Sequence, residues 1–203
     1  FIEYQSNGVG STTRKVRDEL LTIVDNLNHN GWTPVQDTLY EAARYYTGGG
    51  VLYGAKRGGP DSGGPHAYTR VSHERSMAPG SFQINYPDGC SEDDLGDSDC
   101  EDQTIGGEAT YVSPITNYCQ KTSHIVLLTD GFANRDHSDG LIEDFVGISS
   151  CDDLGTEDGG KCVDDLVGHM ANEDMSSINL EQNVITHTIG FNFSSDWLED
   201  VAA

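Results

Sequence analysis

The sequence predicts a single α/β domain in which helices flank a mainly parallel sheet. Two runs rich in β-branched residues, at 124–129 and 183–191, have the length and composition of buried strands. Segments with helical periodicity alternate with these runs along the chain, which is the order found in parallel α/β sheets. A length of 203 residues fits one domain, and we take 1–203 as that domain.

The N-terminal part begins with a short strand at 1–4 and a polar turn at 6–10. Apolar residues then recur at helical spacing and predict an amphipathic helix over about 12–28. A second helix is predicted over about 35–46, and the glycines at 48–50 end it. Because the opening strand reads as already under way, we expect upstream sequence, including a secretory leader, to have been removed.

The middle of the chain, 51–120, is predicted to be a long insertion. It is dense in glycine, proline and serine, shows little periodicity, and contains an acidic run at 91–102. Within the insertion, 81–86 alternates like a short exposed strand.

Regular structure returns after the insertion. The continuous apolar run at 124–129 is typical of a strand covered on both faces. A helix is predicted at 163–170, before the last strand. Another helix is expected to begin near 196 and to be cut off by the end of the chain at 203.

The charge of the chain narrows the classes of partner. With 34 acidic and 11 basic residues the formal net charge is -23, which repels phosphate backbones and attracts divalent cations. Nucleic acid is therefore excluded as a partner, and a solvated surface suited to a salty or extracellular setting is the ordinary interpretation. No apolar stretch approaches 18 residues, so the sequence contains no predicted membrane span.

Five cysteines without a CxxC pair favour disulfides in an oxidising compartment over metal binding. Cys151 and Cys162 enclose a short Gly- and Asp-rich loop and are predicted to pair. Cys90 and Cys100 bracket the acidic run in the same way, which would leave Cys119 free or bonded to missing upstream sequence. Pairing of Cys90 with Cys119 is the alternative.

The acidic run also contains a candidate calcium loop with EF-hand offsets. Its sixth position is Asp102 instead of the glycine that the sharp turn needs, and no helices obviously flank it. The candidate ligands are Asp97, Asp99, Glu101 and Glu108.

Two segments resemble the second and third loops of the metal-ion-dependent adhesion site of von Willebrand factor type A domains. They are Gly31-Trp32-Thr33-Pro34-Val35-Gln36-Asp37-Thr38-Leu39-Tyr40-Glu41-Ala42 and Ile125-Val126-Leu127-Leu128-Thr129-Asp130-Gly131. The resemblance implies that Thr33 supplies a hydroxyl and Asp130 a carboxylate to a divalent cation, Mg²⁺, Mn²⁺ or Ca²⁺. Hard cations prefer such oxygen ligands, and a partner's carboxylate or water would complete the shell.

The resemblance extends to the PilC/PilY family of type IV pilus tip-associated adhesins. It covers most of residues 31–193, including 111–115 with Cys119, Cys162 before an acidic helix, and 182–191. It implies a bacterial surface or pilus-tip location and partners among pilins or minor pilins at the filament tip, with host or abiotic surfaces as further targets. A larger carboxyl-terminal domain, often a β-propeller in this family, would follow.

The chain departs from the family in lacking the first metal loop, Asp-x-Ser-x-Ser. The resemblance implies that this loop lies upstream of Phe1, which would make 1–4 a later strand of the sheet. Without it, Thr33 and Asp130 alone would hold a cation weakly.

Other interpretations of the same residues remain open. Thr33-Pro34 is also a good N-cap followed by proline at the first helical position, and Asp130-Gly131 is also an ordinary turn. Asp136, His137 and Ser138 could suggest a hydrolytic group, although neighbours in sequence seldom converge in that way and a solvated loop is the simpler interpretation.

The sequence therefore predicts a non-enzymatic adhesion or assembly module. The alternative is a structural or regulatory domain with a vestigial metal site, in which the insertion makes the contacts. A hydrolase is the third hypothesis.

Overall fold

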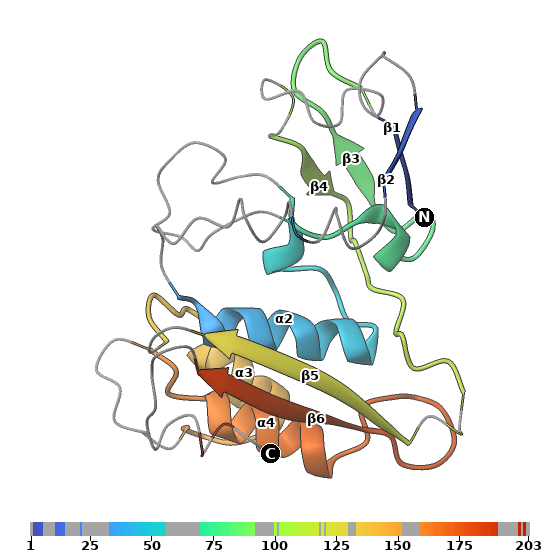
Figure 1. Cartoon of the computed structure of the whole chain (residues 1–203). Coiled ribbons are helices and arrows are strands. Elements are labelled where there is room, and N and C mark those ends of the chain that lie inside the picture. The colour runs from blue at the N-terminus through green and yellow to red at the C-terminus, as the bar shows by residue number, and fades with distance from the viewer. Residues whose placement is uncertain are drawn as a thin grey trace.

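The computed structural model describes residues 2–5, 11–14, 21, 33–55, 70–91, 100, 102–117, 119, 121–129, 133–151, 159–190, 199 and 201. These residues form a mixed α/β structure (Figure 1). The helices are α2 (Val35–Thr47), α3 (Asp139–Val146) and α4 (Val163–Asn172), with short 3₁₀ turns η1 (Tyr53–Ala55) and η2 (Glu74–Ser76). The strands are β1 (Ile2–Gln5), β2 (Ser11–Arg14), β3 (Gln83–Asn85), β4 (Thr104–Gly106), β5 (Thr122–Thr129) and β6 (Asn183–Gly190).

The strands of the described part form three two-stranded sheets, of which one is parallel. β5 and β6 run parallel, from Thr122 opposite Asn183 to Thr129 opposite Gly190. The pairs β1–β2 and β3–β4 are antiparallel. The predicted parallel sheet is thus present as the β5–β6 pair, with α2, α3 and α4 gathered on one side of it in Figure 1. The antiparallel pairs show that the described strands are not mainly parallel.

Helix α2 follows from its apolar spacing. Val35, Leu39 and Ala43 recur at intervals of four and are all buried. Gly48 adopts the left-handed conformation with φ of 70°, and its N–H meets the carbonyls of Arg44 and Tyr45. Glycine suits this capping geometry because it has no Cβ to clash, which confirms the predicted end of the helix.

The main core lies between the inner face of β5–β6 and the helices. Alternate residues of β6, including Val184 and Thr186, point inward and are fully buried. α4 contributes a stripe from Val163 to Met170 and packs on β6 and on α2. The buried apolar members of this core are Val35, Leu39, Tyr40, Ala43, Ile115, Ala133, Ile142, Cys151, Cys162, Val163, Leu166, Val167, Met170, Met175, Val184 and Val201.

The outer face of β5–β6 is open within the described part of the chain. Val126, Leu128 and Ile189 are 53%, 55% and 46% exposed. The rings of His124 and His187 stack beside them, with centroids 5.2 Å apart. The prediction that the 124–129 strand is covered on both faces is therefore wrong for the described residues, although parallel sheets are normally covered on both sides.

One isolated bridge connects the insertion to the residues that follow α2, and a second lies within the insertion. Gly50 pairs with Thr110, and Met77 pairs with Tyr111. Met77, Ala109 and Tyr111 form a second, smaller buried cluster. The predicted exposed strand at 81–86 is confirmed as β3 and pairs with β4.

Two disulfides join the cysteines that the sequence favoured as pairs. Cys90 is bonded to Cys100 and Cys151 to Cys162, with Cα atoms 5.7 and 5.1 Å apart. Cys119 is an exposed free thiol, so the alternative pairing with Cys90 is wrong. Each loop closed by a disulfide is about ten residues long, and each bond limits the freedom of the unfolded chain.

Other expectations need correction. Residues 11–14 form strand β2 against β1, so the predicted helix does not begin at 12, and the opening strand pairs with β2 and not with β5–β6. Leu21 is helical, and the rest of 15–32 lies outside the described residues. Helix α3 was not predicted. No helix in the described part is long and apolar enough to cross a membrane.

The described core predicts that two leucines in neighbouring helices contribute unequally to the free energy of unfolding. Leu166 of α4 is fully buried, whereas Leu141 of α3 is 40% exposed. We expect Leu166→Ala to lower the free energy of unfolding by about 2–5 kcal/mol, because it leaves a cavity, and Leu141→Ala to lower it by less than about 1 kcal/mol. Urea unfolding of both variants measures this. Equal losses would contradict the described core.

Candidate functional site

Thr33 lies against the loop that follows β5. Its backbone N–H donates to Asn134 Oδ1 at 2.7 Å, and the Asn134 N–H donates to the Thr33 carbonyl at 2.9 Å. Asn134 is four residues beyond Asp130 in the chain, and β5 ends at Thr129. Asp130 itself lies outside the described residues. The contact thus brings Thr33 to the strand-end loop that contains Asp130.

The Thr33 side chain does not cap helix α2. The cap position is Pro34, which makes no side-chain cap hydrogen bond, and the first-turn N–H groups of Gln36 and Asp37 donate instead to Asp136 Oδ1 from the segment after β5. The interpretation of Thr33 as an N-cap is therefore wrong. Thr33 contacts the strand-end loop through its backbone N–H and carbonyl, and a role of its hydroxyl as a ligand of a hard divalent cation is what the resemblance implies.

Asp37 joins the first turn of α2 to residues 137 and 138. Its Oδ1 accepts the His137 N–H at 2.8 Å and also the Ser138 hydroxyl in a short hydrogen bond. Its Oδ2 lies 3.4 Å from His137 Nδ1. Tyr53 Oη lies 3.3 Å from Ser138 Oγ. The expectation that this segment is a solvated loop is wrong, because Asp37 and Ser138 are both buried.

The same contacts bear on the hydrolase hypothesis. His137 and Ser138 do meet a carboxylate, that of Asp37, although they are neighbours in sequence, whereas Asp136 accepts the backbone N–H of Asp37. A nucleophilic serine needs access to substrate and a base that takes its proton. Ser138 is fully buried, and its hydroxyl donates a hydrogen bond to Asp37. The described geometry therefore does not offer this serine as a nucleophile.

Asp136 is a partly buried carboxyl group beside a second one. Its Oδ1 accepts the backbone N–H groups of Gln36 at 3.1 Å and Asp37 at 3.4 Å, and its Oδ2 has no hydrogen-bond partner among the described residues. Burial, and then the charge of Asp37, raise the pKa of Asp136 to about 7, while the backbone N–H groups of Asp37, Gly160 and Gln36 partly offset the rise.

Gln36 connects three helices at this end of the sheet. Its side-chain Nε2 donates to Asp139 Oδ1 at 2.5 Å, and its Oε1 accepts the Cys162 N–H at 2.8 Å. Asp139 and Cys162 stand at the starts of α3 and α4. Because Gln36 is fully buried, these hydrogen bonds fix where the two helices begin relative to α2.

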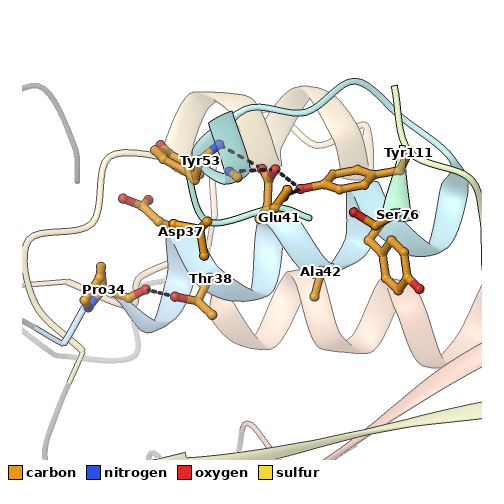
Figure 2. A pocket seen from close by; sticks show the side chains of 12 residues that line it. Pro34, Asp37, Thr38, Glu41, Ala42, Tyr53, Ser76 and Tyr111 are labelled. Carbon is orange, nitrogen blue, oxygen red and sulfur yellow. Dashed lines mark hydrogen bonds between the residues drawn. The ribbon is translucent and has the colours of Figure 1, made fainter. Parts of the chain in front are cut away.

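Glu41 lies one turn beyond Asp37 and holds the insertion to α2. Its Oε1 accepts the N–H groups of Leu52 at 3.0 Å and Gly54 at 2.9 Å and the Tyr111 hydroxyl at 2.5 Å. Its Oε2 accepts the Tyr53 N–H at 3.0 Å. Figure 2 shows this carboxylate between the 3₁₀ turn η1 and the Tyr111 ring.

Partial burial in this environment raises the pKa values of the Tyr111 and Tyr53 hydroxyls. Burial, followed by the hydrogen bond to Glu41, raises the pKa of Tyr111. Burial also raises the pKa of Tyr53. Both hydroxyls therefore stay protonated at neutral pH and remain hydrogen-bond donors.

A cavity of about 510 Å³ lies between α2 and the insertion, and we call it the α2–insertion cavity. Asp37 and Glu41 are on its α2 side, and Tyr53 and Tyr111 face them (Figure 2). Gly54 has no room for a side chain, because a Cβ there would overlap the Ser72 and Tyr111 hydroxyls. The residues that line the cavity are Pro34, Asp37, Thr38, Glu41, Ala42, Tyr45, Tyr53, Gly54, Val71, Ser72, Ser76 and Tyr111.

The remaining candidate ligands do not assemble a cation site in the described residues. Glu108 is exposed in the turn after β4, and its three proposed companions Asp97, Asp99 and Glu101 lie outside the described residues. The side chains of Glu143, Cys151 and Cys162 lie within 4.8 Å of one another. The two cysteines form a disulfide, so they offer no thiolate to a metal.

Comparison of the chain with family models, with curated proteins and with solved structures finds no match.

Two residues of this site, Asp37 and Glu41, were not predicted as functional. The sequence signal was weak, because Asp37 and Glu41 lie four residues apart on the polar face of an amphipathic helix, where charged residues are ordinary. Their partners at 52–54, 111 and 136–138 are distant in sequence, and no local pattern names them.

The raised pKa of Asp136 predicts a pH-dependent stability. Between about pH 4 and pH 7 the unfolded chain ionises Asp136 while the folded chain keeps it protonated, so this group lowers stability as pH rises through that window. We expect Asp136→Asn to remove this pH-dependent loss of stability. The variant should gain on the order of 1–2 kcal/mol relative to the native chain between pH 4 and pH 7, since solvent partly screens the site. Urea unfolding at several pH values measures it, and a constant difference would contradict it.

Replacement of Glu41 should loosen the insertion. Glu41→Gln keeps the shape of the side chain but puts an NH₂ group where an oxygen accepts hydrogen bonds. We expect a loss of about 1–3 kcal/mol in the free energy of unfolding and faster amide exchange at 52–54. The exposed Glu181 provides the matched control, because Glu181→Gln should change neither quantity.

Proposed function

We propose that this chain is a von Willebrand A-like adhesion or assembly module, similar to those of the PilC/PilY family, that binds its partner through a divalent cation at the carboxyl end of β5. The observation that carries the proposal is the pair of hydrogen bonds between Thr33 and Asn134. They put a threonine from the start of α2 beside the loop after a parallel strand. Ligands of open parallel sheets bind at such strand ends.

The described fold supports this proposal. The parallel pair β5–β6 has helices packed on one face, and the carboxyl end of β5 meets the N-terminal end of α2. A Rossmann-type von Willebrand A sheet would extend this pair with further strands. In the proposed site Thr33 supplies a hydroxyl and Asp130 a carboxylate to Mg²⁺, Mn²⁺ or Ca²⁺, and the cation would present an open position to an acidic group of the partner.

The proposed setting is the outside of a bacterial cell. Two disulfides favour an oxidising compartment, and a net charge of -23 argues against nucleic acid as a partner. A secreted protein at the cell surface or pilus tip fits both features. Its partners would be pilins or minor pilins at the filament tip and host or abiotic surfaces.

The alternative is a structural or regulatory domain with a vestigial metal site whose insertion makes the contacts. One observation favours it: Glu41 holds the insertion to α2 and a cavity opens between the two. The two functions differ in their need for a cation, which makes them separable by experiment.

The cation hypothesis predicts binding that depends on two residues. In calorimetric titrations with Mg²⁺, Mn²⁺ and Ca²⁺, Asp130→Ala and Thr33→Val should each weaken binding at least about tenfold, because each removes one of few oxygen ligands. Asp88→Ala removes an exposed aspartate from the turn after β3 and should leave binding unchanged. Equal binding by all variants would reject the site, and no binding by the native chain would favour the vestigial alternative.

A further inference from the structure

The α2–insertion cavity has two unlike walls. Along α2 its lining rises from Asp37 through Glu41 to Tyr45, at the spacing of successive turns. The opposite wall comes from the insertion, where Tyr53 and Tyr111 contribute their rings. A cavity of about 510 Å³ is in the range of sites that bind small molecules or single side chains of a partner.

The cavity has negative charge that its own lining does not balance. Glu41 accepts hydrogen bonds from three backbone N–H groups and one tyrosine hydroxyl, all of them neutral. Asp37 accepts from a backbone N–H and the Ser138 hydroxyl, and meets His137 at 3.4 Å. None of the lining residues in the described part of the chain is lysine or arginine.

Arg70 donates to Gln103 Oε1 at 3.0 Å and to the carbonyl of the lining residue Ser72 at 3.2 Å, and Arg44 is committed as well. Its Nε donates to the Gly50 carbonyl at 2.6 Å, and its Nη1 donates to the Tyr40 hydroxyl at 3.1 Å. Its guanidinium group also lies 5.5 Å from the centre of the Tyr40 ring. Arg44 reaches the cavity only through its field, which lowers the pKa of Tyr111 slightly against the larger effect of burial.

The remaining surface of the cavity suits a flat cation. Tyr45, Tyr53 and Tyr111 supply aromatic surface, and cations are attracted to the faces of such rings. Most of the lone pairs on Glu41 and Asp37 are already used by internal donors, so an incoming cation gains more from charge and ring contact than from new hydrogen bonds. Arginine fits these conditions better than lysine, because its guanidinium is weakly hydrated and stacks on rings.

We propose that the α2–insertion cavity receives an arginine side chain of a protein partner. The acidic helix face supplies the attraction, and the three tyrosines supply the stacking surface. Thr33, the described member of the proposed cation site, is not among the residues that line the cavity.

The first test uses a minimal probe and its neutral isostere. N-acetyl-arginine-N-methylamide is titrated into the full chain and followed by ¹H–¹⁵N NMR, in parallel with the citrulline and lysine analogues. We expect saturable shifts at the amides of 52–54 and 72, with affinity for the arginine probe at least about tenfold above that for citrulline. Equal affinity for arginine and citrulline would overturn the proposal, and a preference for lysine would overturn the choice of arginine.

A matched pair of variants tests the location. Thr38 lines the cavity, is exposed, and makes a hydrogen bond only to the Pro34 carbonyl, so it can be replaced without disturbing Asp37 or Glu41. Thr38→Lys places a cation beside the acidic wall and should weaken the arginine probe at least about tenfold. Thr38→Gln has similar reach without charge and should retain binding. Undiminished binding by Thr38→Lys would overturn the location.

Repetition in EDTA separates this proposal from the cation hypothesis. Binding of the arginine probe should persist in EDTA and in Asp130→Ala. Loss of probe binding under both conditions would show that the shifts come from the cation site and would overturn the separate cavity. Failure of the chain to bind Mg²⁺, Mn²⁺ or Ca²⁺ has no bearing on the arginine result.

Discussion

The carboxylate of Glu41 is the interaction on which the placement of the insertion depends. Four donors from η1 and Tyr111 converge on one side chain of α2. Without that carboxylate three backbone N–H groups would lose their acceptor, and unsatisfied buried donors cost more than an ordinary hydrogen bond returns. Polar contacts at one helix face therefore attach the insertion to the α/β part, together with Ile115 in the main core, Tyr53 packed against that core, and the small cluster around Met77 and Tyr111.

Asp37 performs the same task one turn earlier, for a different segment of the chain. It receives the segment that follows β5, whereas Glu41 receives the insertion. α2 thereby carries the strand-end loop and the insertion on consecutive turns of one rigid element. The cavity lies between this helix and the insertion, which Glu41 attaches to α2 without the space beside the helix being filled.

The sequence predicted those elements whose local pattern and tertiary role agree. α2 has apolar residues at helical spacing and a glycine at its left-handed end, and β5, β6 and α4 are long enough for their periodicity to show. α3 was missed because it has only eight residues and starts with Asp139-Gly140, a pair typical of turns. Residues 12–14 were assigned to the start of a helix because they precede an apolar periodicity, yet they pair with β1. Pairing of two segments overrides a weak local preference.

The candidate site was predictable only in part. The two motifs predicted that Thr33 lies near the loop after β5, because strand-end loops of a parallel sheet converge. The hydrogen bond between Thr33 and Asn134 agrees with this. The burial of Asp136 and Ser138 could not be read from the sequence, because it depends on Asp37, which lies about a hundred residues away. Acidic residues near a turn look solvated in any local window.

The Cys151–Cys162 disulfide is shielded from reductants by the folded structure. Cys162 is completely covered and Cys151 is 5% exposed, so a dissolved reductant cannot reach the sulfurs without opening the start of α4. Cys90, at the edge of the insertion, is only partly covered and its bond exchanges more readily. If the folded protein moved to a reducing medium, the Cys90–Cys100 disulfide would thus be reduced first. The Cys151–Cys162 disulfide, formed during folding in an oxidising compartment, would persist.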